Sequence, residues 1–275
     1  MTVRTLLTAA QNYYVRTDGN DANDGSANDA AHAWATIQHA LDWIKQNIDL
    51  GNYRAYVNLG NAGNYAGFLV FNHFVGGSNC NFTELYLQAP VIIRGPAGTL
   101  DRVIVGGNDV ANSVIGIEWV KFQDPGNNTP ALKASMGGHI FRGFVEFGTR
   151  GTGPGGIHEY VCHGGRISTY GGCNISGGGW ARSFAERQAN IEDYGIPAWV
   201  EAITTLVGFT AGYYVSGDQG FILVNGKTYA GAGNVTPVTP QCSVYNGGGI
   251  QTWGGLAAIP GSGFIGVGSN GAWVN

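Results

Sequence analysis

The chain is poor in charge, and its few charged residues form no runs. Only 32 of its 275 residues are charged (18 acidic, 14 basic), 12% against about 25% in typical soluble domains. The net charge is −4 and no cluster of Lys or Arg is present, so no nucleic-acid partner is expected. No apolar stretch reaches the roughly 18 residues that span a bilayer, so no membrane insertion is expected.

Cysteine is also scarce, and its placement excludes two kinds of stabilisation. The sequence has no CxxC pair and no regular cysteine spacing, which argues against a zinc site or a disulfide framework. Residues 1–14 contain one Arg and only a short apolar run, too weak for a secretory signal. We therefore expect free thiols packed in a core made in a reducing cytoplasm, and no cofactor. The four thiols are Cys80, Cys162, Cys173 and Cys242.

Glycine is abundant instead. There are 47 Gly, about 17% against a typical value near 7%. A collagen-like period is absent, and 44% hydrophobic residues argue against disorder, because such a chain can bury a core. The composition indicates many short strands joined by turns, where Gly is needed.

A short phrase ending in Ile recurs along the second half of the chain. The spacings between its Ile residues are 27, 29, 26 and 28 residues. A period of 20 to 50 residues indicates a repeat architecture. The repeat lacks the leucine-rich frame and is shorter than the ~40 residues of a propeller blade. The five phrases are Gly137-Gly-His-Ile140, Gly164-Gly-Arg-Ile167, Tyr194-Gly-Ile196, Gln219-Gly-Phe-Ile222 and Gly247-Gly-Gly-Ile250.

About 27 residues with a rise of ~3.3 Å per residue make one turn of a three-sided coil. Stacked coils place equivalent side chains above one another, so the phrases predict one internal column. Its predicted members are Ile140, Ile167, Ile196, Ile222 and Ile250. The fold class is therefore all-β, a right-handed parallel β-helix with coils of about 27 residues. It is expected to run over residues 54–275 as a single continuous domain.

One helix is predicted, between Thr36 and Ile48. Ile37, Leu41 and Ile44 fall on a single apolar stripe with Ala40 and Ile48, Thr36 is a plausible N-cap, and Gly51 is a plausible stop signal. A solenoid end exposes unpaired backbone and apolar side chains and needs a cap. Residues 1–53 are therefore expected to form an extended segment and a capping α-helix.

The opening of the chain resembles a known group. The stretch Tyr13-Tyr-Val-Arg-Thr-Asp-Gly-Asn-Asp-Ala-Asn-Asp-Gly25, followed by Trp34-Ala-Thr-Ile-Gln-His-Ala-Leu41, is similar to the start of pectate-lyase-like β-helix proteins of tailed phages and prophages. The Gly-Gly-x-Ile repeats and the Gly-rich ending resemble the same group. The resemblance implies a homotrimer on a virion surface, in a tail spike or tail fibre. It implies no particular activity, because such coils serve as shafts, glycan binders and glycan-cleaving enzymes.

The Asp- and Asn-rich turn near residue 20 is a candidate calcium site. Its oxygen ligands suit Ca²⁺, but the EF-hand frame is missing, since Ala22 takes the fifth position and no Glu closes the loop. The default interpretation is a hydrogen-bonded Asx turn with no metal. The candidate ligands are Asp18, Asn20, Asp21 and Asp24.

Carboxylates are the natural pair for glycan cleavage. Glu118 and Asp124 are predicted on one strand and turn, and Asp101 and Asp109 flank the preceding turn. A cleft between neighbouring coils is conceivable, but surface carboxylates that only confer solubility give the same pattern. A lyase would need a basic residue beside calcium-binding acids, and only isolated Arg94 and Arg102 offer one.

Two further residue types are candidates. His139 and His163 lie one coil apart, with His158 in the same coil as His163, and stacked imidazoles can bind a metal. Arg166 occupies the position equivalent to His139, which favours an exposed variable corner instead. Among the aromatic residues, Trp119, Trp180 and Trp273 are out of phase with the repeat or terminal, and are candidate platforms for sugar rings.

These observations together predict a trimeric β-helical spike or fibre appendage of a phage-type virion, made in the bacterial cytoplasm. Its expected partners are other virion proteins and a host cell-surface glycan. Two alternatives stay open. One is a tailspike-like hydrolase or lyase that degrades host polysaccharide, and the other is a structural particle component without a ligand.

Overall fold

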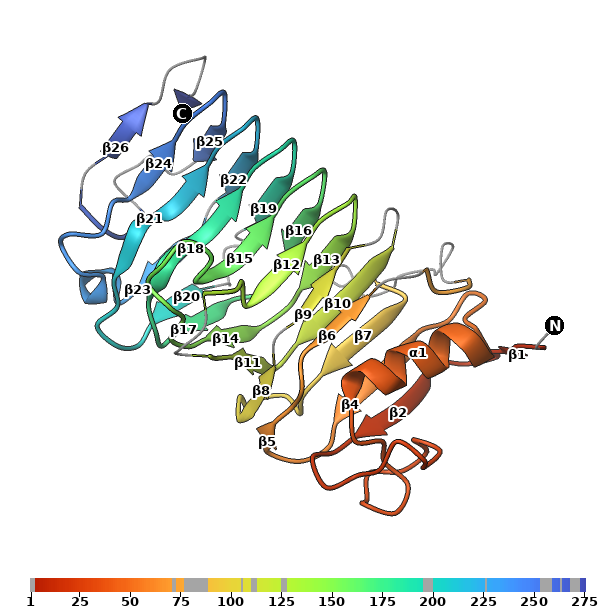
Figure 1. Cartoon of the computed structure of the whole chain (residues 1–275). Helices are drawn as coiled ribbons and strands as arrows, with labels where there is room; N and C mark the ends of the chain where they lie inside the picture. Colours follow the sequence, from red (N-terminus) through yellow and green to blue (C-terminus); the bar gives the residue numbers. More distant parts are fainter. Residues whose placement is uncertain are drawn as a thin grey trace.

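The chain coils into a stack of parallel strands in the computed structural model (Figure 1). The structure describes residues 3–70, 73–76, 89–104, 106–109, 113–124, 128–194, 200–225, 227–252, 259–262, 264–267 and 273–275. Its long sheets have ten, seven and eight strands, and each pairing between their strands is parallel. The predicted parallel β-helix is confirmed.

The ten-stranded sheet forms one side along the whole stack. Its first strand lies within residues 1–53 and pairs with the second across the predicted domain boundary. The strands, in spatial order, are β2 (Gln11–Val15), β4 (Ala55–Leu59), β7 (Val91–Arg94), β10 (Val114–Glu118), β13 (His139–Arg142), β16 (Arg166–Thr169), β19 (Asn190–Tyr194), β22 (Phe221–Asn225), β25 (Gly249–Thr252) and β27 (Trp273–Val274).

The other two sheets complete each coil. The seven-stranded sheet contains β5 (Gly63–Asn64), β8 (Arg102–Ile104), β11 (Val120–Phe122), β14 (Val145–Phe147), β17 (Cys173–Ile175), β20 (Val200–Ile203) and β23 (Thr228–Ala230). The eight-stranded sheet contains β6 (Phe68–Val70), β9 (Gly106–Asn108), β12 (Leu132–Ala134), β15 (Ile157–Val161), β18 (Gly179–Ala185), β21 (Phe209–Ser216), β24 (Cys242–Val244) and β26 (Phe264–Val267).

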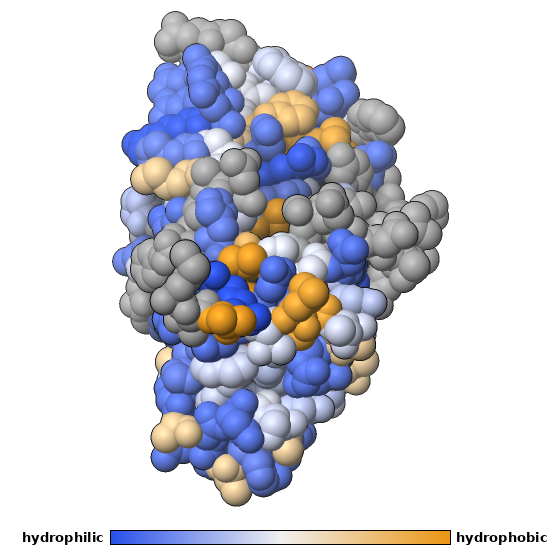
Figure 2. All heavy atoms as spheres, turned by 90° about the vertical axis from the view of Figure 1, so that its right-hand side faces the viewer, coloured by the Kyte–Doolittle hydropathy of each residue, from blue (hydrophilic) through white to orange (hydrophobic). Residues whose placement is uncertain are grey.

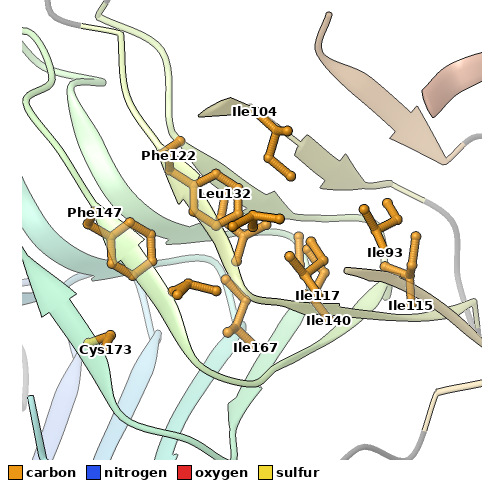
Figure 3. Packing of buried hydrophobic residues seen from close by; sticks show 14 of the residues in the cluster. Ile93, Ile104, Ile115, Ile117, Phe122, Leu132, Ile140, Phe147, Ile167 and Cys173 are labelled. Carbon is orange, nitrogen blue, oxygen red and sulfur yellow. The ribbon is translucent and has the colours of Figure 1, made fainter. Parts of the chain in front are cut away.

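The Ile column is present inside the ten-stranded sheet. Ile140 pairs with Ile167, Ile222 pairs with Ile250, and all four side chains are fully buried. The position between them belongs to Ile191, which pairs with both Ile167 and Ile222. The assignment of Ile196 to this column is therefore wrong, and Ile196 itself lies outside the described residues. Stacked aliphatic and aromatic side chains fill the interior of the neighbouring coils (Figure 3).

Tight turns explain the recurring Gly-Gly phrase. At the corner between the eight-stranded and ten-stranded sheets, Gly165 N donates to Cys162 O at 3.0 Å, and the two central residues His163 and Gly164 have φ of 50° and 73°. Positive φ at both positions defines a type I′ turn, which favours Gly. A Cβ on Gly165 would lie 2.2 Å from Ala134 O in the coil below. The first Gly thus serves the turn and the second permits close stacking.

The same turn closes the coil that contains Ile191. There Ala189 N donates to Glu186 O, and Arg187 and Gln188 take the positive-φ positions. Because this turn contains no glycine, the Gly-Ile pattern does not identify it and instead points to Ile196.

Helix α1 (Ile37–Asn47) covers the N-terminal end of the stack. Thr36 Oγ1 accepts a hydrogen bond from His39 N at 3.2 Å, as expected of an N-cap. Ile37, Leu41 and Ile44 are buried against the first strands, which confirms the predicted cap.

The helix ends earlier than Gly51 suggested. Ile48 is already extended and begins the short strand β3 (Ile48–Asp49), which pairs with β1 (Thr5–Leu6). Seen from this end, the described surface is mostly hydrophilic, with small separate hydrophobic patches (Figure 2). Among the described residues no helix is long and apolar enough to cross a membrane.

Candidate functional site

A row of outward-facing side chains crosses the first four strands of the ten-stranded sheet. Tyr14 on β2 pairs with Asn58 on β4, Asn58 pairs with Arg94 on β7, and Arg94 pairs with Glu118 on β10. Adjacent strands lie about 4.8 Å apart, so the four side chains extend about 14 Å along the solenoid axis. Each residue is at or next to the end of its strand, where the chain turns the corner.

A cavity of about 420 Å³ lies beside this row. Its wall continues along the corner after the strands, with Gly60, the Gly95-Pro96-Ala97 turn and Trp119. The volume falls within the range of sites for small ligands. We call this cavity, with the row that lines it, the corner cleft.

Trp119 is held by its backbone and by a ring contact. Its φ is 57°, a left-handed conformation that turns the chain sharply after β10. Its indole stacks on the Phe144 ring with 4.8 Å between centroids and a 30° interplanar angle. One face of the indole is thus covered by protein while the residue as a whole stays half-buried beside the cleft.

Arg94 is fixed in the cleft by its neighbours. Its Nε donates to Asn58 Oδ1 at 2.9 Å and its Nη2 donates to Asn12 Oδ1 at 3.2 Å. Its guanidinium lies over the Tyr56 ring, 3.7 Å from the centroid. Since three side chains orient the guanidinium, little rotamer entropy is lost when a ligand binds it.

The N-terminal loop forms the rim. Asn28 Oδ1 accepts from Arg16 Nη1 at 3.2 Å, and Asn28 itself lines the cleft. Arg16 is in turn paired with Asp18 at 2.8 Å. The N-terminal loop therefore contributes directly to this site.

The chemistry of the cleft suits a polar ligand with apolar faces. Tyr14 and Trp119 offer ring faces, while Asn28 and Asn58 offer amide groups that both donate and accept. Arg94 adds fixed donors and Glu118 adds acceptors. A sugar ring has this combination of C–H faces and hydroxyl edges.

The structure brings two of the predicted site residues together and separates the others. Glu118 and Trp119 both line the corner cleft. Asp101 precedes β8 and Asp124 follows β11, both on the seven-stranded sheet. Asp109 follows β9 on the eight-stranded sheet, where it accepts from Ser135 Oγ and pairs with Lys133 at 3.3 Å. Of the four candidate carboxylates, Glu118 alone lines the corner cleft.

The other two candidate platforms lie elsewhere. Trp180, on β18, meets the Phe184 ring edge-on at 5.4 Å within an outer aromatic cluster of the eight-stranded sheet. Trp273, on β27, is 43% exposed and packs against Phe221. Only Trp119 is placed beside hydrogen-bonding groups in a cavity.

The candidate calcium residues are engaged separately. Asp18 binds Arg16, and Asp24 accepts from the backbone N and Oγ of Ser26. Asn20 accepts from Ala22 N in an Asx turn. Asp21 accepts from the backbone N of both Ala35 and Thr36 at 2.9 Å, which ties the loop to the start of α1. Within the described part of the chain, no three His, Cys, Asp or Glu side chains are grouped to hold a metal.

The three candidate histidines have different surroundings. His139 Nε2 lies 2.9 Å from Ser168 Oγ, and burial together with the Arg166 cation lowers the pKa of His139 to about 3. His163 is exposed and contacts Arg187. His158 is fully buried and stacks on Phe147 at 5.1 Å.

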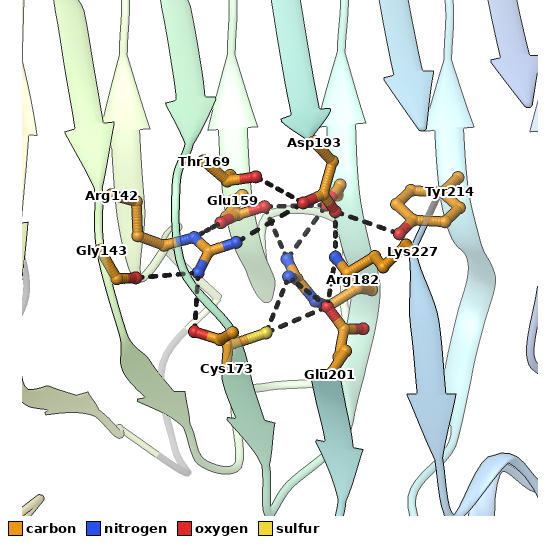
Figure 4. A network of polar contacts seen from close by, with 12 residues as sticks. Arg142, Gly143, Glu159, Thr169, Cys173, Arg182, Asp193, Glu201, Tyr214 and Lys227 are labelled. Carbon is orange, nitrogen blue, oxygen red and sulfur yellow. Dashed lines mark hydrogen bonds and ion pairs between the residues drawn. The ribbon is translucent and has the colours of Figure 1, made fainter. Parts of the chain in front are cut away.

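A second feature, which no sequence pattern indicates, is a charged network inside the solenoid (Figure 4). Three cations and three carboxylates lie there, none with a side chain more than 5% exposed. The cations are Arg142, Arg182 and Lys227, and the carboxylates are Glu159, Asp193 and Glu201.

The network bridges all three sheets. Arg142 and Asp193 come from β13 and β19 of the ten-stranded sheet, Glu201 from β20, and Glu159 and Arg182 from β15 and β18. Glu159 joins the two arginines, at 2.5 Å from Arg142 Nε and 2.7 Å from Arg182 Nη1. The formal charges cancel, as the burial of ions requires.

The directions of the pKa shifts agree with a fully ionised network. Burial acts to raise the pKa of Glu201, but Arg182 and Lys227 outweigh burial and hold this pKa well below its ordinary value. Burial alone would lower the pKa of Lys227, yet Asp193 and Glu201 hold it above its usual range. Because these groups are sealed from solvent, the network is no binding site for an outside ligand.

The described cysteines behave as expected. Cys162, Cys173 and Cys242 are buried and free, while Cys80 lies outside the described residues. Burial raises the pKa of Cys173, with the Glu201 charge adding to it, and the pKa of Cys242, each to about 12. Both thiols are therefore protonated and unreactive at neutral pH.

No protein-family model matches the chain, and no curated protein and no solved structure shows significant similarity to it.

Proposed function

We propose that this protein is a β-helical appendage of a phage-type virion, of the spike or fibre kind, that binds host surface glycan in the corner cleft. The observation that carries the proposal is the row Tyr14–Asn58–Arg94–Glu118, ending beside Trp119. The virion context rests on the resemblance of residues 13–25 and 34–41 to phage β-helix proteins.

The geometry favours binding of an extended saccharide over capture of a small ion. The row runs along the solenoid axis, so successive coils present successive contacts to a linear chain. Two aromatic side chains flank polar groups held in place by hydrogen bonds, as Arg94 is by Asn12 and Asn58. Preorganised donors of this kind lower the entropic cost of binding.

The number of carboxylates in the cleft favours binding without cleavage over hydrolysis. Hydrolysis needs a general acid and a second carboxylate about 5 to 10 Å away. Among the described residues that line the cleft, Glu118 is the single carboxylate. The hydrolase or lyase remains the alternative function, and release of reducing ends would identify it.

The proposal includes a homotrimer in contact with other virion proteins. Long faces with little charge tend to associate, and closed symmetry satisfies them without open fibres. Light scattering after size exclusion should give the mass of three chains. A mass of one chain that does not change on concentration would contradict the trimer while leaving the cleft untouched.

A glycan array followed by calorimetry tests the binding function. The protein should bind a subset of bacterial surface glycans, and Arg94→Ala and Trp119→Ala should each weaken binding at least about tenfold, or 1.4 kcal/mol. Trp180→Ala, on another sheet, is the matched control and should bind like the parent. Equal loss in the control, or no loss in either cleft variant, would contradict the assignment.

A further inference from the structure

Lys227 makes two carboxylate contacts inside the solenoid. Its Nζ contacts Asp193 Oδ2 and lies 2.6 Å from Glu201 Oε2. Its side chain is only 5% exposed, while those of Asp193 and Glu201 are 2% and 0% exposed. Lys227 precedes β23 and Asp193 lies on β19, so the contact joins chain segments 34 residues apart.

Aromatic side chains surround this triad. Tyr213 donates to Glu201 Oε1, and Tyr214 donates to Asp193 Oδ2 at 3.3 Å. The Tyr229 ring lies 5.8 Å from Lys227 Nζ, and its hydroxyl is 2.8 Å from that of Tyr214. An amine and a carboxyl group thus touch in a site without bulk water, next to a second carboxylate.

We propose that Lys227 and Asp193 become joined by an intramolecular isopeptide bond once the chain has folded, with Glu201 carrying the protons. A buried lysine amine is a nucleophile when it loses its proton, and contact with the acceptor replaces a bimolecular encounter. The bond is independent of the glycan site, because the triad lies inside the coils and the cleft outside them.

The reaction balances without an added reagent. Glu201 takes a proton from Nζ, and the neutral amine attacks Asp193 Cγ, forming the C–N bond. Two of the three ammonium protons pass through Glu201 to Oδ2, which leaves Cγ as water. The third proton remains on the amide nitrogen. Glu201 ends as the carboxylate it was, so it acts as a general base and then as a general acid.

Neighbouring groups polarise the carboxyl group under attack. Thr169 Oγ1 donates to Asp193 Oδ1, and Arg142 Nη2 lies 3.8 Å from the same oxygen. Charge develops on this oxygen as the amine adds, and fixed donors stabilise such charge in a buried site.

The charge balance favours Asp193 over Glu201 as the linked residue. Glu201 also binds Arg182 Nη2 at 2.9 Å, so its loss would leave that cation with Glu159 as its remaining partner. Linking Lys227 to Asp193 removes one positive and one negative charge together. Arg142, Arg182, Glu159 and Glu201 then remain, two of each sign.

Intact-mass spectrometry of the purified, denatured protein tests the proposal. The parent chain should weigh less than its sequence by one water molecule. Lys227→Arg keeps the charge but cannot form this amide, and should show the full sequence mass. Asp193→Asn should lose ammonia instead of water and give the same product mass as the parent. Lys121→Arg, from a half-buried ion pair with Glu146 at 2.7 Å on the outer face, is the control and should keep the water loss.

Tandem mass spectra of the digested protein locate the bond. One branched peptide should contain both Asp193 and Lys227. A parent chain at its full sequence mass, or a water loss that persists in Lys227→Arg, would overturn the proposal. A branched peptide linking Lys227 to Glu201 would overturn the assignment of Asp193.

Discussion

Glu201 and Arg182 face each other across 2.9 Å at the centre of the solenoid, and neither side chain is exposed to solvent. Each residue comes from a different sheet, so their ion pair links two walls of the coil. Such a pair contributes little net free energy compared with well-packed apolar residues, but loss of one partner leaves an uncompensated buried charge. The second half of the stack therefore depends on the network remaining complete.

Removal of one buried carboxylate should be far more costly than removal of a surface one. Glu159→Gln leaves Arg142 and Arg182 without their shared partner and should lower the free energy of unfolding by about 3–5 kcal/mol. Glu146→Gln, which breaks the pair with Lys121 on the outer face, should cost about 0–1 kcal/mol. Urea unfolding measures both, and similar losses would contradict the role given to the network.

Stability should fall as the pH drops below about 6.5. Burial, with Arg182 and Arg150 nearby, lowers the pKa of His158 well below its ordinary value, and that of His139 is lowered to about 3. The unfolded chain therefore binds protons that the folded protein does not, which reduces the free energy of unfolding with falling pH. Urea unfolding at a series of pH values from 7 to 5 measures the slope of the unfolding free energy against pH. His158→Phe should reduce this slope by an amount that corresponds to at most one bound proton.

At lower pH the Glu201 carboxylate should add to this loss. Burial acts to raise the pKa of Glu201, but Arg182 holds it well below its ordinary value, so its stabilisation is present above about pH 4 and disappears as the pH falls towards the folded-state value. Stability that is constant from pH 7 to pH 5 and unaffected by His158→Phe would contradict the histidine prediction.

The Ile column should be sensitive to truncation. Ile167 is fully buried between Ile140 and Ile191, and Ile167→Ala should cost about 2–5 kcal/mol through lost burial and the cavity left behind. Leu206, 73% exposed, is the control, and Leu206→Ala should change stability by less than about 0.5 kcal/mol. Thermal and urea unfolding measure the difference, and equal effects would refute the column as a core element.

The repeat could be predicted because the tight turn in most coils uses glycine at two positions, and glycine is easily recognised in the sequence. Gly164 lies in a type I′ turn, and Gly165 lies where two backbones approach closely. The spacing between such glycine pairs along the sequence therefore predicts the coil length. The same reasoning failed at Ile191, where Gln188 and Ala189 replace the glycines. Positive φ at a residue other than Gly leaves no signal in the sequence.

The site could be predicted only in part. Trp119 and Glu118 were identified because one is out of phase with the repeat and the other is a carboxylate near a turn. Arg94 and Asn58 join them only through pairing of strands 36 residues apart, which no local pattern encodes. The buried network was missed because charged residues are expected on the outer face.

The cap should be necessary for solubility. Leu41 is fully buried on the inner side of α1, and Leu41→Asp places a charge between the helix and the first coil. The variant should expose strand ends and aggregate during size exclusion. Gln46→Asp, on the exposed side of the same helix, should stay soluble. A soluble, fully folded Leu41→Asp protein would show that the helix is dispensable as a cap.

A crystal structure with the glycan selected by the array tests the central claim most directly. The saccharide should lie along Tyr14, Asn58, Arg94 and Glu118, with one ring against Trp119 and hydrogen bonds to Arg94. Saccharide found instead on the outer face at Trp180 or at Trp273, with the corner cleft free, would contradict the proposed function.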